Sequence, residues 1–153
     1  MKILLEKTLN ITEDKEKTNI IIPFDVPQNV EKLHLSFSYT PKVLMNEDKA
    51  IAKALACLRH DSECYREFKD EDIEKFLPIV NLITLSLDDP EKYRGCAHRH
   101  SPTQRHSISL ESASSGFYKG EIISGEWRAN LHVHALVTDY CECKLKIEAE
   151  EVQ

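Results

Sequence analysis

Residues 127–137 read WRANLHVHALV, and residues 141–149 read CECKLKIEA. Apolar and polar side chains alternate along both stretches, which is typical of strands with one buried face. The segment 138–140 between them is short and polar. A three-residue loop there predicts a β-hairpin in which Val137 is paired with Cys141, and this register collects the apolar side chains on one side.

A two-residue loop would give a different register. It would place His134 beside Cys143, and with His132 this would form a His/His/Cys set of the kind that binds zinc. That register would also bury lysines beside valines, since a shift by one residue turns every side chain to the other face. The first register is therefore favoured. It makes Cys141 and Cys143 core thiols and leaves His132 and His134 on the solvent face, where we expect no cofactor beyond an adventitious divalent metal ion.

Shorter stretches with strand character lie upstream. They occupy residues 18–24, 33–39, 79–87 and 106–110. Pro23 indicates that the first of these strands lies at a sheet edge or ends there, because proline donates no ladder hydrogen bond. The four glycines mark turns between strands. Together these patterns predict a mainly β fold, an antiparallel β-sandwich that forms a single domain over residues 1–153.

Residues 46–77 have a helical character and predict an insertion between two strands. Apolar residues recur there at helical spacing, namely Ala50, Ile51, Ala54, Leu55 and Leu58. Asn46 is a suitable N-cap, and Cys57 is expected on the buried side. A second short helix is predicted after Asp70 and ends before Pro78.

Composition narrows the class of protein. The chain has 153 residues, 41% hydrophobic residues and a net charge of −6. This acidity argues against nucleic acid as a partner, since nucleic-acid binders usually carry a basic face. No apolar run approaches the roughly 20 residues needed to cross a membrane. The N-terminus becomes charged within six residues and the five cysteines are odd in number, so we expect a cytoplasmic protein with reduced thiols.

Several short motifs follow one another in an order found in a known family. They are NLITLSLDDP from Asn81, YRG from Tyr93, SGFYKGEI from Ser115, SGEW from Ser124, and the strands of 130–148. In this order they resemble the N-terminal β-domain that precedes the catalytic module of some polymerase-and-histidinol-phosphatase (PHP) type metal-dependent phosphoesterases. The phrase VPQNVEKLHLSFSY is similar to that domain's opening strands. The resemblance covers the chain apart from 46–77.

The resemblance implies a non-catalytic accessory domain. In that family the catalytic histidines and aspartates belong to the barrel that follows, and none of them maps onto this sequence. His132-Val-His134 is similar to the barrel's first motif but departs from it, because Thr138-Asp139-Tyr140 stands where the family has Ser-Asp-Gly. The implied partners are a separately encoded phosphoesterase or a second copy of this chain. The alternative is a small metal-dependent hydrolase that uses the surface histidines.

One loop is rich in basic side chains. Residues 91–104 are predicted to form a polar loop, and between positions 93 and 106 the chain has no acid. Its cationic and imidazole groups are Arg94, His98, Arg99, His100, Arg105 and His106. Arginine binds phosphate or carboxylate with two parallel hydrogen bonds, so these residues form a candidate anion-binding site. The alternatives are a three-histidine metal site and a solvated loop. The neighbouring Asp88 and Asp89 are expected to cap and shape a turn.

Overall fold

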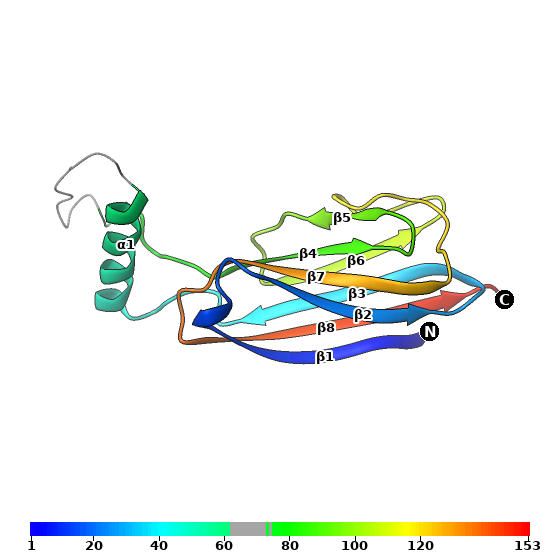
Figure 1. Cartoon of the computed structure of the whole chain (residues 1–153), viewed down its shortest axis with the longest axis horizontal. Helices are drawn as coiled ribbons and strands as arrows, with labels where there is room; N and C mark the ends of the chain where they lie inside the picture. Colours follow the sequence, from blue (N-terminus) through cyan, green and yellow to red (C-terminus); the bar gives the residue numbers. More distant parts are fainter. Residues whose placement is uncertain (62–72, 74) are drawn as a thin grey trace.

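Two antiparallel sheets of four strands pack face to face (Figure 1). The computed structural model describes residues 1–61, 73 and 75–153. The strand order is β1-β8-β3-β6 in one sheet, called sheet A here, and β2-β7-β4-β5 in the other, called sheet B. The strands are β1 (Lys2–Thr12), β2 (Asn19–Val26), β3 (Val30–Thr40), β4 (Leu82–Asp88), β5 (Tyr93–Ala97), β6 (Thr103–Ser109), β7 (Gly125–Ala135) and β8 (Tyr140–Glu151). The predicted antiparallel β-sandwich is confirmed.

The strands pair by a simple rule. The first strand pairs with the last, β2 with β7, β3 with β6 and β4 with β5, all antiparallel. Further pairings of β3 with β8 and β4 with β7 complete the sheets. A chain paired in this way is one long two-stranded ribbon rolled into a sandwich, which is the jelly-roll arrangement.

The alternating pattern of the sequence sets the core. Along β3, Leu33, Leu35 and Phe37 are buried, while the residues between them face outward. Across the core, Trp127 on β7 is fully buried in sheet B. Burial of each such large side chain contributes about 1.5–3 kcal/mol. Pro23 lies in β2, an edge strand of sheet B, as its lack of an N–H predicts.

The predicted terminal hairpin is wrong. β7 belongs to sheet B and β8 to sheet A, so the connection between them crosses from one sheet to the other. Asn81 fastens this crossing: its Nδ2 donates to Thr138 Oγ1 at 2.8 Å, and its Oδ1 accepts from Val137 N at 2.7 Å. The predicted inward parity holds, since Cys141 and Cys143 are buried core thiols. A period of two identifies the buried face of a strand, but it does not distinguish neighbours in one sheet from partners across the core.

Two strands lie where none was predicted. β5 occupies part of the predicted polar loop, because Arg94 is buried within the fold by partners described below. β1 forms an edge of sheet A, although its sequence KILLEKTLNIT lacks a clean alternation. Exposed residues dominate it, which is why the sequence gives no strand signal there.

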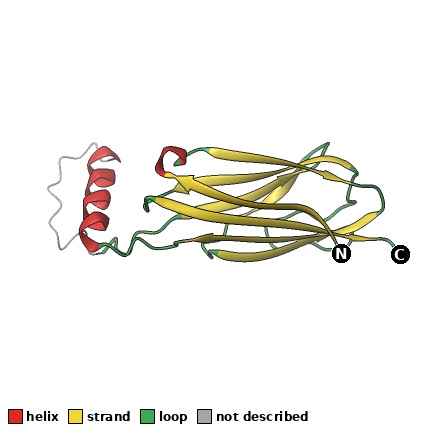
Figure 2. Cartoon of the chain, turned by 90° about the horizontal axis from the view of Figure 1, so that it is seen from below, coloured by secondary structure: helices red, strands yellow, loops and turns green. Residues whose placement is uncertain are grey.

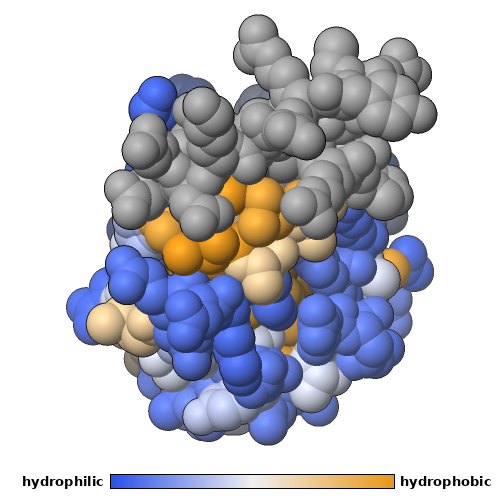
Figure 3. Space-filling view, turned by 90° about the vertical axis from the view of Figure 1, so that its left-hand side faces the viewer, coloured by the Kyte–Doolittle hydropathy of each residue, from blue (hydrophilic) through white to orange (hydrophobic). Residues whose placement is uncertain are grey.

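The predicted insertion contains one described helix, α1 (Glu47–Asp61). Asn46 caps it as predicted, because its Oδ1 accepts from Lys49 N at 3.0 Å. Figures 1 and 2 show α1 beyond one end of the sandwich, and Figure 3 shows apolar side chains gathered at this end among polar ones.

Two predictions within the insertion have different outcomes. The expected burial of Cys57 is wrong: it is exposed, because the buried side of α1 carries Ala50 and Ala54 instead. The predicted second helix, from after Asp70 to before Pro78, falls in part on 71–72 and 74, outside the described residues, whereas Phe76 lies in a turn and Leu77 in a loop. No described helix is long and apolar enough to cross a membrane.

Candidate anion-binding face

The fold separates the six residues of the predicted anion site. Arg94 and His106 point into the protein and are buried. His98, Arg99 and His100 are exposed in the loop between β5 and β6, and Arg105 is exposed on β6. The set therefore forms no single site, and each group has a different role.

Arg94 is fully buried and its donors are already used. Its guanidinium donates to Asp89 Oδ2 at 3.0 Å and to the carbonyl oxygens of Tyr118, Gly120 and Glu121 at 3.2, 3.1 and 2.9 Å. It also lies 5.1 Å from the centre of the Trp127 ring. These contacts hold the chain between β6 and β7 onto β5, so Arg94 stabilises the fold and is closed to an external anion.

Asp89 is the charge partner of Arg94. Burial acts to raise the pKa of its carboxyl, but hydrogen bonds from the backbone N–H groups of Glu91 and Lys92 and from Arg94 outweigh it and hold the pKa below its ordinary value. The two backbone bonds shape the turn after β4. The predicted capping of this turn is therefore found at Asp89.

His106 is a core residue. Its Nε2 is 2.9 Å from Gln104 Oε1, its ring packs 5.1 Å from that of Phe117, and its Nδ1 has no partner among the described residues. Since the amide oxygen only accepts, Nε2 carries the proton. Burial, and then the charge of Arg99, lower the pKa of His106. The imidazole is therefore held neutral and does not serve an anion.

The lowered pKa of His106 makes stability depend on pH. The unfolded chain binds a proton near pH 6.5 that the folded chain takes up only at lower pH. The free energy of unfolding is therefore expected to fall as the pH drops below about 6.5. His106→Gln removes this titration, so urea unfolding at pH 7 and pH 5 is expected to show a smaller difference than in the wild type. An equal or larger difference in the variant would contradict this assignment.

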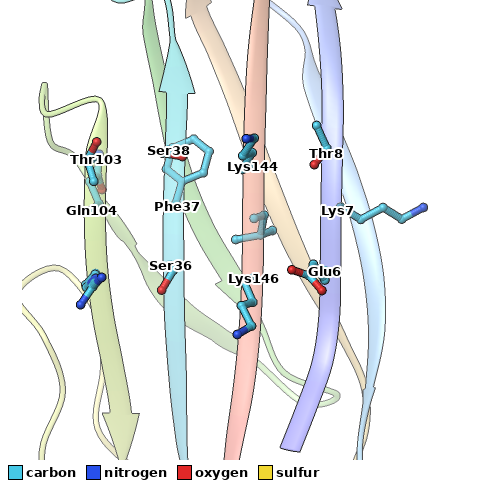
Figure 4. Close-up of a pocket in the computed structure, with 12 residues that line it drawn as sticks. Glu6, Lys7, Thr8, Ser36, Phe37, Ser38, Thr103, Gln104, Lys144 and Lys146 are labelled. Atoms are coloured by element: carbon cyan, nitrogen blue, oxygen red, sulfur yellow. The ribbon is translucent and has the colours of Figure 1, made fainter.

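Arg105 lies on the outer face of sheet A, where the side chains form a shallow trough of about 330 Å³ (Figure 4). Two cross-strand rows line it. The first row is Glu6, Lys146, Ser36 and Arg105, and the second is Thr8, Lys144, Ser38 and Thr103. The small serines on β3 keep the centre of the trough low, between the longer side chains of β6 and β8.

The trough collects more positive than negative charge. Arg105, Lys144 and Lys146 line it together with one acid, Glu6. Lys7 also lines the trough, but its side chain extends away from it in Figure 4. Arg105 is exposed on β6, and Ser36 and Ser38 are half-buried between it and the lysines. These groups face a ligand that enters the trough.

Both lysines have acidic neighbours on their own strand. Lys144 Nζ is 3.4 Å from Glu142 Oε1, and Lys146 Nζ is 2.7 Å from Glu148 Oε1. The hydrogen bond that Lys146 donates to Glu148 is the main cause that raises the pKa of Lys146. The Lys144 pair is exposed and the Lys146 pair is half-buried. Ion pairs at the protein surface contribute little to stability, so an incoming anion can compete with them.

His132 and His134 lie on the outer face of sheet B, as predicted, and take part in a diagonal series of side-chain bonds. His134 Nε2 is 2.8 Å from Thr84 Oγ1, and His132 Nε2 is 2.8 Å from Ser86 Oγ. Asn130 Nδ2 continues the series by donating to Asp88 Oδ2 at 2.7 Å. His132 and Asn130 thus each reach the β4 residue beyond their direct partner. The H-x-H spacing serves this cross-strand series.

The contacts of His132 show which of its ring nitrogens carries the proton. Nδ1 lies 2.7 Å from Asn19 Oδ1, an acceptor, so Nδ1–H donates and Nε2 accepts from Ser86. Burial lowers the pKa of His132, and His134 and His98 lower it further. The order hydroxyl, imidazole, amide also occurs in hydrolytic triads. Here Ser86 is 2% exposed and β4 is paired on both sides, so the sheet uses the backbone N–H groups that an oxyanion would need.

The metal prediction gains no support from this geometry. Within residues 1–61, 73 and 75–153, no three His, Cys, Asp or Glu side chains come together to hold a metal ion. His132 and His134 thus lack a third ligand in the described chain, and the nitrogens named above are engaged by hydroxyl and amide groups.

Sequence reasoning missed most of the trough. It identified Arg105, but Lys144 and Lys146 were assigned only to the polar side of a strand. Their alternation with Cys143 and Leu145 was visible. Their position beside Ser36 and Arg105 depends on the pairing of β8 with β3 and of β3 with β6, which no local pattern encodes.

Comparison with known proteins does not assign the chain to a family. It matches no protein-family model, no curated protein and no solved structure. The similarity to the PHP accessory domain therefore stays a prediction from the sequence.

Proposed function

We propose that this chain is a non-catalytic binding domain that holds an anionic partner in the trough on the outer face of sheet A. The supporting observation is the convergence of Arg105, Lys144 and Lys146 around the small hydroxyl side chains of Ser36 and Ser38. Guanidinium and ammonium groups supply charge-assisted hydrogen bonds to carboxylate or phosphate, and the hydroxyls add neutral donors.

The proposed site shares one residue with the anion site predicted from the sequence. It lies on the outer face of sheet A and not in the loop. Arg105 remains, whereas Arg94 and His106 belong to the protein interior. The exposed loop residues His98, Arg99 and His100 are available to extend contacts with a large partner. The partner proposals made from the PHP resemblance, a separately encoded phosphoesterase or a second copy of this chain, fit a binding domain of this kind.

Substitutions in the trough test the proposal. Arg105→Gln, and separately the double change Lys144→Gln with Lys146→Gln, are each expected to weaken binding of inorganic pyrophosphate by about 3- to 10-fold, since hydrogen bonds to charged groups contribute roughly 1 kcal/mol or more. Binding is measured by isothermal titration calorimetry at low salt, because screening weakens exposed charge pairs.

Lys7→Gln is the matched control. It removes the same charge from a residue that extends away from the trough (Figure 4), so pyrophosphate affinity is expected to stay within about 2-fold. Equal losses in Lys7→Gln and in the trough variants would show a non-specific response to net charge. Absence of pyrophosphate binding by the wild type at low salt would refute the proposal.

A further inference from the structure

We infer that the ligand of the trough is an acidic polypeptide segment in extended conformation, with carboxylates at alternate positions. This inference rests on the proposed function, since it specifies which anion the trough fits. Three features of the trough support it, namely the spacing of the cations, the residues at its base, and the acids that contact the lysines.

The spacing of the two lysines matches an extended peptide. Lys144 and Lys146 lie two residues apart on β8 and face the same side. Strand geometry puts their Cα atoms roughly 6.8 Å apart, and side chains at alternate positions of an extended ligand repeat at the same interval. Two carboxylates of such a ligand therefore lie in register with the two ammonium groups.

Arg105 supplies a third contact across the trough. β6 lies two strands from β8, with β3 between them, which is about 9.5 Å in the plane of the sheet. The guanidinium binds a carboxylate through two parallel hydrogen bonds. A peptide seated over Ser36 and Ser38 is thus held from both sides, and its polar backbone meets hydroxyl groups below.

The residues that line the trough disfavour nucleic acid as the ligand. Proteins that bind single strands stack bases on exposed aromatic rings. The aromatic residue among those that line the trough is Phe37, which is 1% exposed and points into the core. The net charge of −6 also repels a long polyanion, whereas a short acidic segment responds mainly to the local cations.

The protein's own acids already occupy the positions of such a ligand. Glu142 and Glu148 place carboxylates on Lys144 and Lys146 from either end of the pair. An acidic peptide would replace these contacts with contacts of the same chemistry. Removing Glu148 is therefore expected to free Lys146 and strengthen peptide binding.

Two fluorescent peptides of equal charge test the inference. One alternates glutamate and serine over eight residues. The other has the same composition arranged as two Glu-Glu-Ser-Ser repeats, so no two of its glutamates lie two positions apart on one side of an extended chain. Fluorescence anisotropy is expected to show at least 3-fold tighter binding of the alternating peptide. Lys144→Gln with Lys146→Gln is expected to abolish the preference, Glu148→Gln to tighten binding about 2- to 5-fold, and Lys7→Gln to leave it unchanged.

The outcomes separate this inference from the proposed function. Equal binding of both peptides, with pyrophosphate still bound through the trough residues, would overturn the inference and leave the anion-binding function in place. Tighter binding of a single-stranded oligothymidylate than of the alternating peptide would also overturn it. Failure of pyrophosphate and of both peptides to bind would refute the proposed function itself.

Discussion

Arg94→Leu is expected to lower the free energy of unfolding by about 3–5 kcal/mol, since removal of one partner of a buried ion pair leaves an uncompensated charge. The variant would leave Asp89 without its counter-ion and deprive the carbonyl groups of Tyr118, Gly120 and Glu121 of a donor. Urea unfolding at pH 7, followed by fluorescence of Trp127, measures the loss.

Three comparisons make this result specific. Arg105→Leu changes the same residue type at an exposed position and is expected to alter stability by about 0.5 kcal/mol or less. Arg94→Lys keeps the charge but loses the planar fork that reaches four acceptors, so most of the loss should remain. Removing both charges, as in Asp89→Asn with Arg94→Leu, should cost less than the two single changes added together. A loss below about 1 kcal/mol in Arg94→Leu would contradict the structural role.

Gly95→Ala is expected to cost about 3 kcal/mol or more, since strained backbone alone costs roughly 1–3 kcal/mol. Gly95 has φ of +108°, and a Cβ there would lie 2.2 Å from the carbonyl oxygen of Gly116 and 2.6 Å from Phe117 Cα. Both contacts are with backbone, which also bonds β5 through Cys96 N and Gly116 O at 3.0 Å. The methyl group would therefore push apart the segment that also holds Arg94.

Thermal unfolding measures this effect. For a domain of this size, a loss of 3 kcal/mol corresponds to a decrease in Tm of about 6–12 °C. Gly120→Ala is the matched control: its φ is +155°, but the nearest atom to a Cβ is 3.5 Å away. A Tm for Gly95→Ala equal to that of Gly120→Ala would show that the close backbone approach does not contribute.

The sequence pattern indicates which face of each strand is buried more clearly than it indicates which strands are paired. In β3 the buried side chains alternate with outward ones, and in β7 they do so apart from the buried Asn130, so a period of two reveals the buried faces. The pairing of β8 with β1 and β3 involves residues more than a hundred positions apart. A local pattern carries no information on such pairings, so the separation of β7 and β8 into different sheets escaped prediction.

The same limit explains the candidate site. Arg105 was recognised from the density of basic residues around it. The same density included Arg94, whose hydrogen bonds are all made in the interior of the fold. Nothing in the segment YRGCA distinguishes a buried arginine from an exposed one. The difference arises from Asp89 and from carbonyl groups on another loop, which meet Arg94 only once the ribbon is rolled.

The pairing of β1 with β8 has a consequence for biosynthesis. The first strand finds its hydrogen-bonding partner in residues 140–151, so sheet A cannot close until nearly all of these residues have left the ribosome. Until then the apolar side chains of β1 lack their native cover, which exposes the nascent chain to aggregation. Such distant contacts also give a high contact order, which places refolding in the millisecond-to-second range.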